Sequence, residues 1–181
     1  MIKKIKYTLN RVQPIKVARP MTKYIMKNNK IKEMYGLEIG THRGENAYNM
    51  LKLLDIKKMF FVDPYLPHST GCKHYKKAKK ILSKWQNKIY FRLAKSDDAS
   101  KMFRDHYFDF IYIDGDHSYE AVKRDIELYY PKVKIGGVLG GHDFCGSCPG
   151  VCKAVLEFVD KYAEKNDLKF HSWDKDWWIQ K

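Results

Sequence analysis

Carboxylates and imidazoles collect at the ends of the short apolar runs of this sequence. They are Asp63, Asp97, Asp114-Gly115-Asp116-His117 and His142-Asp143. Acidic side chains are costly to bury without a partner, so their repeated placement at these positions indicates a shared function. If the runs are parallel strands, their carboxyl ends meet along one rim, which is where open sheets bind ligands. The pattern therefore predicts a ligand site along this rim.

A glycine-framed turn, Gly40-x-x-x-Gly44, follows the apolar run 34–39. Glycine lets the backbone approach a ligand where a Cβ atom would clash. Asp63 lies 23 residues after Gly40, about where the ribose-binding acid of a dinucleotide fold stands. A plain strand-to-helix turn explains the glycines equally well, so the turn alone indicates only a nucleotide-like ligand.

The elements that must position these residues alternate between short apolar runs and longer amphipathic stretches, as in repeated βα units. Strands are predicted at 34–39, 58–62, 89–93, 108–113, 133–139, 168–173 and 177–180, and helices at 45–54, 74–85, 118–130 and 151–162. The last two strands have no helix between them, which predicts an antiparallel hairpin. We expect an α/β fold with a Rossmann-like, doubly wound sheet of about seven strands, mostly parallel.

The chain length of 181 residues, with 44% hydrophobic residues, suits a single buried core. We expect one domain over 31–181 and a basic N-terminal arm or short helices over 1–30. The net charge of +14 attracts anions, so this arm is a candidate site for nucleic acid, acidic glycans or phospholipid head groups. A lysine-rich proteome would give the same charge without any such partner.

The basic N-terminus is not followed by an apolar run of signal-peptide length, and no stretch approaches a membrane span. We therefore expect a cytoplasmic protein with reduced thiols. His142-x-x-Cys145-x-x-Cys148-x-x-x-Cys152 has a spacing compatible with zinc or an iron–sulfur cluster. Because Cys72 is the only other cysteine, we favour unliganded thiols along a loop. Trp173, Trp177 and Trp178 are expected to pack in the core or at a sheet edge.

Several motifs resemble those of class I S-adenosylmethionine-dependent methyltransferases. Glu38-Ile39-Gly40-Thr41-His42-Arg43-Gly44 resembles their first motif, in the form found in catechol O-methyltransferase-like enzymes, and Phe61-Val62-Asp63 resembles the second. The runs 109–119 and 136–143 are similar to the fourth and post-fourth motifs of small bacterial and archaeal O-methyltransferases. The resemblance covers residues 34–159. Many relatives carry glycine where this chain has His42.

The resemblance implies S-adenosylmethionine as cofactor. It assigns cofactor binding to Glu38, Gly40, Thr41, Gly44, Asp63 and Asp114, and places Ser96 and Asp97 near the adenine ring. Serine followed by aspartate after a strand is equally an ordinary helix N-cap. The resemblance to metal-dependent members further implies a divalent cation at Asp114, His142 and Asp143. Carboxylates suit magnesium, and an added imidazole shifts the preference toward manganese, iron or zinc. The alternative role for His142 is a hydrogen bond within the rim.

Methyl transfer to a hydroxyl requires removal of its proton, which a metal and a nearby carboxylate can promote. Asp116 is the candidate base, as in similar enzymes, with helix capping as its other role. His117 is the second candidate because its ordinary pKa is near neutrality. The expected acceptor is a sugar, glycan or small metabolite. In so short a chain the acceptor pocket is either open or completed by another subunit of a homo-oligomer.

Two other function classes share part of this pattern. An NAD-linked oxidoreductase also uses a glycine-rich turn and a ribose-binding acid, but the glycine spacing and the acids at the strand ends disfavour it. A non-enzymatic basic module would bind polyanions through residues 1–30.

Overall fold

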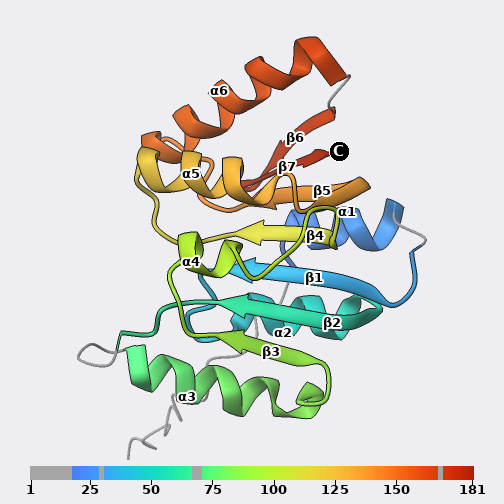
Figure 1. Ribbon diagram of the computed structural model, residues 1–181, viewed down its shortest axis with the longest axis vertical. Helices are drawn as coiled ribbons and strands as arrows, with labels where there is room; N and C mark the ends of the chain where they lie inside the picture. The colour runs from blue at the N-terminus through green and yellow to red at the C-terminus, as the bar shows by residue number, and fades with distance from the viewer. Residues whose placement is uncertain (1–17, 29–30, 67–70, 167–168) are drawn as a thin grey trace, which may run out of the picture.

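The protein, seen as a computed structural model, forms one seven-stranded sheet in the order β3-β2-β1-β4-β5-β7-β6 (Figure 1). The structure describes residues 18–28, 31–66, 71–166 and 169–181, with backbone alone for 163–166. The strands are β1 Met34–Ile39, β2 Ile56–Val62, β3 Ile89–Arg92, β4 Phe108–Ile113, β5 Val133–Gly141, β6 Lys169–Trp173 and β7 Asp176–Gln180. β1 to β5 are parallel, whereas β7 runs antiparallel to β5 and β6. The expected doubly wound sheet with its C-terminal hairpin is confirmed.

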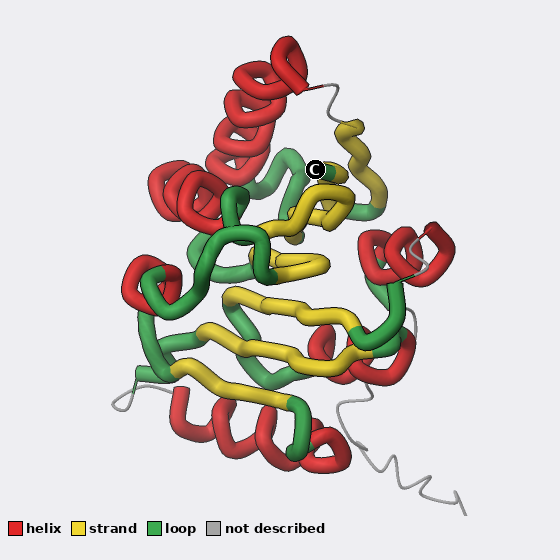
Figure 2. The backbone as a smooth tube through the Cα atoms, turned by 45° about the vertical axis from the view of Figure 1, so that its right-hand side comes forward, coloured by secondary structure: helices red, strands yellow, loops and turns green. Residues whose placement is uncertain are grey.

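Helices cover both faces of the sheet (Figure 2). They are α1 Pro20–Asn28, α2 Glu45–Leu53, α3 Gly71–Leu82, the 3-10 helix η1 Ser83–Trp85, α4 Ser96–Ser100, α5 Tyr119–Tyr129 and α6 Pro149–Asn166. Side chains of α4, α5 and α6 belong to one buried cluster, and those of α1, α2 and α3 belong to the other. The strands are thus enclosed on both sides, as expected for parallel βα units.

The central strand β4 shows how the sheet separates these two clusters. Ile111 and Ile113 pack on the α5 side, and Phe110 and Tyr112 pack on the α2 side. Successive side chains of a strand point to opposite faces. Because both faces are buried, the strand reads in sequence as a continuous apolar run, and its predicted bounds are correct.

The first helix lies within the segment 1–30 that was expected as an arm or short helices. Met21 and Ile25 are each only 1% exposed, and α1 contacts β5, β7 and α2. The Met21 N–H donates to the Asp176 carboxylate at the start of β7. The α1 helix therefore packs on the sheet through its buried face, while Met26 on its other side is 53% exposed. The rest of the expected arm, residues 1–17, lies outside the described part of the chain.

The C-terminal hairpin holds the three tryptophans in different environments. Trp177 and Trp178 are buried on opposite faces of β7, as expected for core residues. Trp173 ends the edge strand β6, so it lies at the sheet edge as expected, but it is 72% exposed and is not packed there. An edge strand has a partner on one side only, which leaves its last side chain uncovered.

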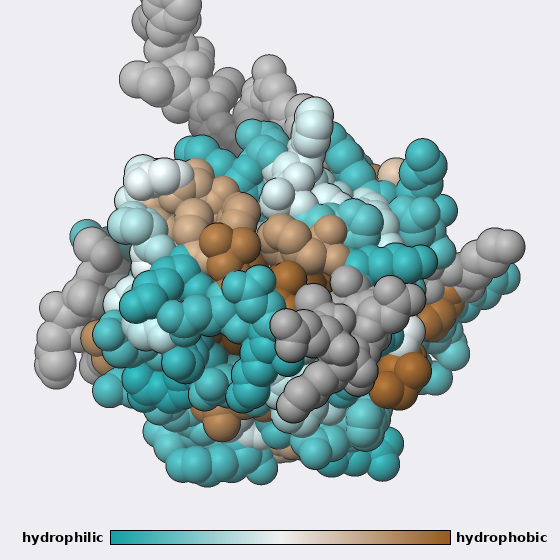
Figure 3. All heavy atoms as spheres, turned by 90° about the horizontal axis from the view of Figure 1, so that it is seen from above, coloured by the Kyte–Doolittle hydropathy of each residue, from teal (hydrophilic) through white to brown (hydrophobic). Residues whose placement is uncertain are grey.

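The surface is mainly hydrophilic when viewed from the α6 end of the molecule, with an apolar area near the middle of that face and a smaller one toward its right-hand side (Figure 3). This agrees with a chain in which charged residues make up 31% of the sequence. Among the residues that the structure describes, no helix combines the length and apolar character needed to cross a bilayer.

Candidate active site

A cleft of about 760 Å³ opens at the carboxyl ends of β1, β2 and β4, with α4 and α5 along its wall. Of the predicted site residues, it is lined by Gly40, Asp63, Ser96, Asp97, Asp114, Asp116 and His117. Its volume falls within the range of small-molecule sites. The structure therefore brings the acids of two strand ends, β2 and β4, and of α4 to one concave surface beside the glycine turn after β1, as the parallel sheet requires.

The turn after β1 brings two strand ends into close backbone contact. Gly40 has φ +81°, and a Cβ atom there would overlap the backbone carbonyl of Asp114. Gly44, also at φ +81°, precedes the first turn of α2. His42 adopts φ +49°, a left-handed conformation that favours glycine. This conformation explains physically why glycine is common at the position in similar proteins, and the His42 ring is packed 4.1 Å from that of His74.

Glu38, Thr41 and Gly44 are not among the residues that line the cleft. Glu38 is 1% exposed, and its Oε1 accepts a 2.9 Å hydrogen bond from Asn46 Nδ2. Its Oε2 has no partner among the described residues. Burial raises the pKa of Glu38 to about 8. The structure thus places Glu38 beneath the turn that shapes the cleft.

Asp63 follows β2 and has its carboxylate fixed by the backbone. Oδ2 accepts from the His42 N–H and Oδ1 from the Tyr65 N–H, both at 2.9 Å. Each carboxylate oxygen can accept more than one hydrogen bond, so the group is held in place and still has acceptor capacity on the cleft side.

The α4 helix sets the opposite wall. Its N-cap is Lys95, without a side-chain cap, so Ser96 is not the N-cap that its sequence also suggested. Asp97 Oδ2 accepts a 2.6 Å hydrogen bond from Arg124 Nη1, and this bond lowers the pKa of Asp97. Arg124 and the buried Asp125, whose pKa burial raises to about 6, also line the cleft. Arg124 and Asp125 both lie in α5, and neither was predicted from the sequence as a site residue.

Asp116 and His117 follow β4, and both lie in the cleft. Asp116 Oδ1 accepts a 2.8 Å hydrogen bond from the Ser118 N–H, whereas Ser118 itself is the N-cap of α5. The hydrogen bond from the Ser118 N–H lowers the pKa of Asp116, so the Asp116 carboxylate is a weak base. The nearby carboxylates of Asp114 and Asp143 raise the pKa of His117, so its imidazole keeps a proton to higher pH.

The predicted metal ligands Asp114, His142 and Asp143 do come together. Their ligand atoms lie within 4.8 Å of one another. His142 Nδ1 is 3.0 Å from Asp143 Oδ1 and 3.9 Å from Asp114 Oδ1, and Asp143 adopts φ +60° directly after His142. His117 Nε2 lies 3.2 Å from Asp143 Oδ2. Two imidazoles and two carboxylates therefore share one rim.

Arg19 is a residue of this rim that the sequence did not reveal. It precedes α1, and its Nη2 lies 3.2 Å from Asp114 Oδ2, on the side of the carboxylate away from the histidines. Its Nη1 donates to the Tyr112 hydroxyl at 2.8 Å, and that hydroxyl donates to Asp176 at 2.7 Å. Asp176 is fully buried. The local sign of such a residue was Asp176, a carboxylate at the start of an apolar strand, because a buried carboxylate needs a polar or charged partner.

The loop cysteines are free thiols. Within the described residues, they do not gather with His142 into one ligand set. Cys145 Sγ contacts Ser147 Oγ at 3.1 Å, and Cys152 Sγ donates to the Cys145 carbonyl at 3.3 Å. Cys148 instead joins His117 and Asp143, with ligand atoms within 4.8 Å of one another, and burial raises the pKa of its thiol.

Solved structures with the same fold include two O-methyltransferases. The enzyme from Bacillus cereus, in complex with SAH, is 16% identical, with a TM-score of 0.66 over 91% of this chain and 82% of that chain. TomG from Streptomyces achromogenes, involved in tomaymycin synthesis and in complex with SAM, is 13% identical, with a TM-score of 0.68 over 91% and 80%. At this identity the likeness concerns the fold.

Sequence comparison adds the family. An uncharacterized protein of Acanthamoeba polyphaga mimivirus is 29% identical over 111 residues, 60% of this chain and 50% of that protein. The chain thus spans about half the length of the curated relative it matches. The profile of the family described as "Methyltransferase domain" matches residues 37–144, from β1 to the loop after β5. The chain therefore belongs to the methyltransferase domain family, and its resemblance to class I methyltransferases is confirmed.

Proposed function

We propose that this protein transfers the methyl group of S-adenosylmethionine to a hydroxyl oxygen. The observation that carries the proposal is the cleft itself. Gly40 packs so closely on the Asp114 backbone that a Cβ atom would clash there. Asp63 and Asp97 line the cleft beside this contact. The O-methyltransferases of similar fold, solved with SAH or SAM, support the assignment.

The cleft residues fit the polar groups of this cofactor. Asp63, held by two backbone N–H groups, is placed to accept hydrogen bonds from ribose hydroxyls. Ser96 and Asp97 stand on the wall formed by α4, where the adenine would lie. Asp114, at the end of the central strand, lies between the glycine turn and the two histidines, so it would be near the sulfonium end of a bound cofactor.

A divalent cation fits Asp114, His142 and Asp143, which are metal ligands by type and whose ligand atoms lie within 4.8 Å of one another. When bound, it would lower the pKa of the acceptor hydroxyl. Asp116 would then receive the proton, which a weak base can do once the hydroxyl is acidified. His117 is less suited to this role while it carries its own proton.

The proposed acceptor is a sugar, glycan or small metabolite. The rim around Asp114 and His117 borders the cleft, and the His117 side chain is 45% exposed. An acceptor that projects into solvent would therefore meet no obstruction at this side chain. We also propose a cytoplasmic location, which the free thiols of the loop cysteines support.

Transfer of a labelled methyl group from S-adenosylmethionine to a panel of hydroxyl acceptors tests the proposal. Asp63→Asn should reduce transfer at limiting cofactor at least about tenfold, because it weakens recognition of the ribose. Asp55→Asn, a change of the same kind on an exposed residue before β2, should leave transfer unchanged. Equal activity of wild type and Asp63→Asn would contradict the proposed cofactor site.

A further inference from the structure

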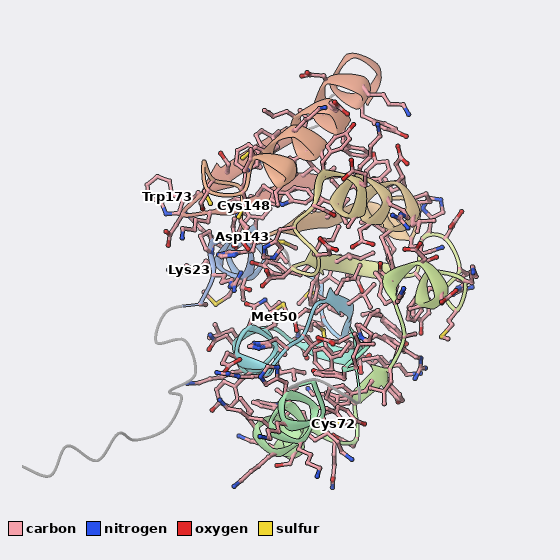
Figure 4. The ribbon with its side chains drawn as sticks, turned by 90° about the vertical axis from the view of Figure 1, so that its left-hand side faces the viewer. Lys23, Met50, Cys72, Asp143, Cys148 and Trp173 are labelled. Atoms are coloured by element: carbon pink, nitrogen blue, oxygen red, sulfur yellow. The ribbon has the colours of Figure 1, made fainter. Side chains whose placement is uncertain are left out.

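A second ligand set at the rim includes a sulfur atom. His117 Nε2, a carboxylate oxygen of Asp143 and Cys148 Sγ lie within 4.8 Å of one another. Asp143 and Cys148 approach each other at the end of β5 and the start of α6 (Figure 4). We propose that His117, Asp143 and Cys148 bind a thiophilic divalent cation, of which Zn²⁺ is the best match.

The charges around the two carboxylates favour Asp143 as the anchor of this site. Asp114 already faces the Arg19 guanidinium at 3.2 Å. Asp143 has only the two histidines as ionic partners among the described residues, with His117 at Oδ2 and His142 at Oδ1. A cation therefore gains more from Asp143, whose charge is not compensated by a permanent cation.

The backbone presents these ligands from two short loops. His117 lies between β4 and α5, while Asp143 and Cys148 lie between β5 and α6. The second loop is tied down, because the Phe144 N–H donates to Lys175 in the hairpin and the Cys148 N–H donates to Cys145. His142 Nδ1, at 3.0 Å from Asp143 Oδ1, would fix the carboxylate while Oδ2 binds the ion.

The chemistry of the ligands selects the class of ion. Thiolate, imidazole and carboxylate together are ligands of zinc and similar transition metals, whereas magnesium and calcium prefer oxygen alone. Cation binding would displace the proton of the half-buried Cys148 thiol. Three protein ligands leave a fourth tetrahedral position open, as in catalytic zinc sites.

The open position gives the ion a role that rests on the proposed function. His117 lines both the main cleft and a small cavity shared with Asp114 and His142, so an ion bound to it borders the acceptor end of the cleft. A hydroxyl acceptor is the group that this position would take. In that arrangement His117 is a metal ligand, and Asp116 remains the base.

Cobalt spectroscopy of the full chain tests the site without using catalysis. Addition of Co²⁺ to the reduced protein should produce a thiolate-to-cobalt charge-transfer band, which Zn²⁺ should remove and Mg²⁺ should not. Cys148→Ser should abolish the band, and His117→Gln should weaken Co²⁺ binding at least about tenfold. Cys145→Ser is the matched control, since it removes a nearby thiol outside the set, and it should keep the band.

Two results would overturn the proposal: a folded wild-type protein that gives no thiolate band, or a band that survives in Cys148→Ser. Circular dichroism on each variant establishes folding, and serine is close to cysteine in size. Calorimetry with S-adenosylhomocysteine on the same samples separates this proposal from the proposed function. Cofactor binding without the band would contradict the cation site alone, and the band without cofactor binding would contradict the methyltransferase assignment alone.

Discussion

The two ends of the cleft are stabilised in different ways. At the proposed cofactor end, lined by Gly40, Asp63 and Asp97, the carboxylates are held by backbone N–H groups of nearby turns or by an exposed arginine. At the proposed acceptor end, around Asp114 and the neighbouring Asp143, the partners are two histidines and an arginine from the N-terminal segment, with buried Tyr112 and Asp176 behind them. The contacts at the cofactor end thus join residues no more than 27 positions apart, whereas Tyr112 at the acceptor end contacts Arg19 and Asp176, which lie 93 and 64 positions away.

Gly40, where the two ends meet, should give the largest effect. Gly40→Ala places a Cβ atom against the Asp114 carbonyl in a left-handed conformation. We expect a loss of about 4 kcal/mol in the free energy of unfolding, measured by urea denaturation. Gly146→Ala, with nothing within 4 Å of the added atom, is the control and should change stability by less than about 1 kcal/mol. Similar losses in both variants would show that the close contact does not exist.

The acceptor end depends on Arg19. Arg19→Gln removes the guanidinium that faces Asp114, Tyr112 and the fully buried Asp176. We expect a loss of about 3 kcal/mol in the free energy of unfolding, because buried carboxylates lose their cation. Thermal and urea unfolding measure it. Wild-type stability in this variant would mean that the N-terminal segment does not organise the acceptor end.

The buried acid beneath the cofactor end makes stability depend on pH. Burial raises the pKa of Glu38 to about 8 from an ordinary 4.5, so the folded state favours the neutral acid. The stability that this group contributes is complete below pH 4.5 and is lost as the pH rises through about 8.

Glu38→Gln should therefore remove a decline of roughly 1 kcal/mol per pH unit across that range. Urea denaturation at several pH values measures the difference between variant and wild type. The exposed Glu120→Gln is the control and should follow the wild-type profile. Parallel profiles for wild type and Glu38→Gln would contradict a neutral buried Glu38.

The ion pair on the cofactor wall should matter least for stability. Arg124 and Asp97 are 2.6 Å apart, but their side chains are 52% and 42% exposed, so water screens the pair. Arg124→Gln should cost less than about 1 kcal/mol of unfolding free energy. Arg124→Gln makes the same chemical change as Arg19→Gln. A larger loss of unfolding free energy in Arg124→Gln than in Arg19→Gln would contradict the difference between the two ends of the cleft.

Sequence reasoning was most accurate where structure is local. The buried runs of β1 and β4 predicted both strands to the residue, because parallel strands covered on both faces are continuously apolar. The glycine turn and Asp63 were equally visible, since they depend on spacing along one βα unit. Helix α4 was missed because five residues carry too short a pattern to show a period.

The acceptor end was only partly predictable. Asp114, His142 and Asp143 followed from the strand ends and the resemblance, and their proximity is observed. Arg19 was hidden in a segment whose charge suggested an external arm, and its role follows only from the packing of α1 against β7. Cys148 was visible as part of a cysteine-rich run, but its neighbours His117 and Asp143 are determined by the way two loops meet in space.

Calorimetric titration with S-adenosylhomocysteine tests the central claim most directly, because it asks whether the cleft binds this cofactor. The account predicts saturable binding with one site per chain, weakened by Asp63→Asn and unchanged by Asp55→Asn. It also predicts no heat of binding with NAD. Failure of wild-type protein to bind S-adenosylhomocysteine or S-adenosylmethionine at millimolar concentration would contradict it.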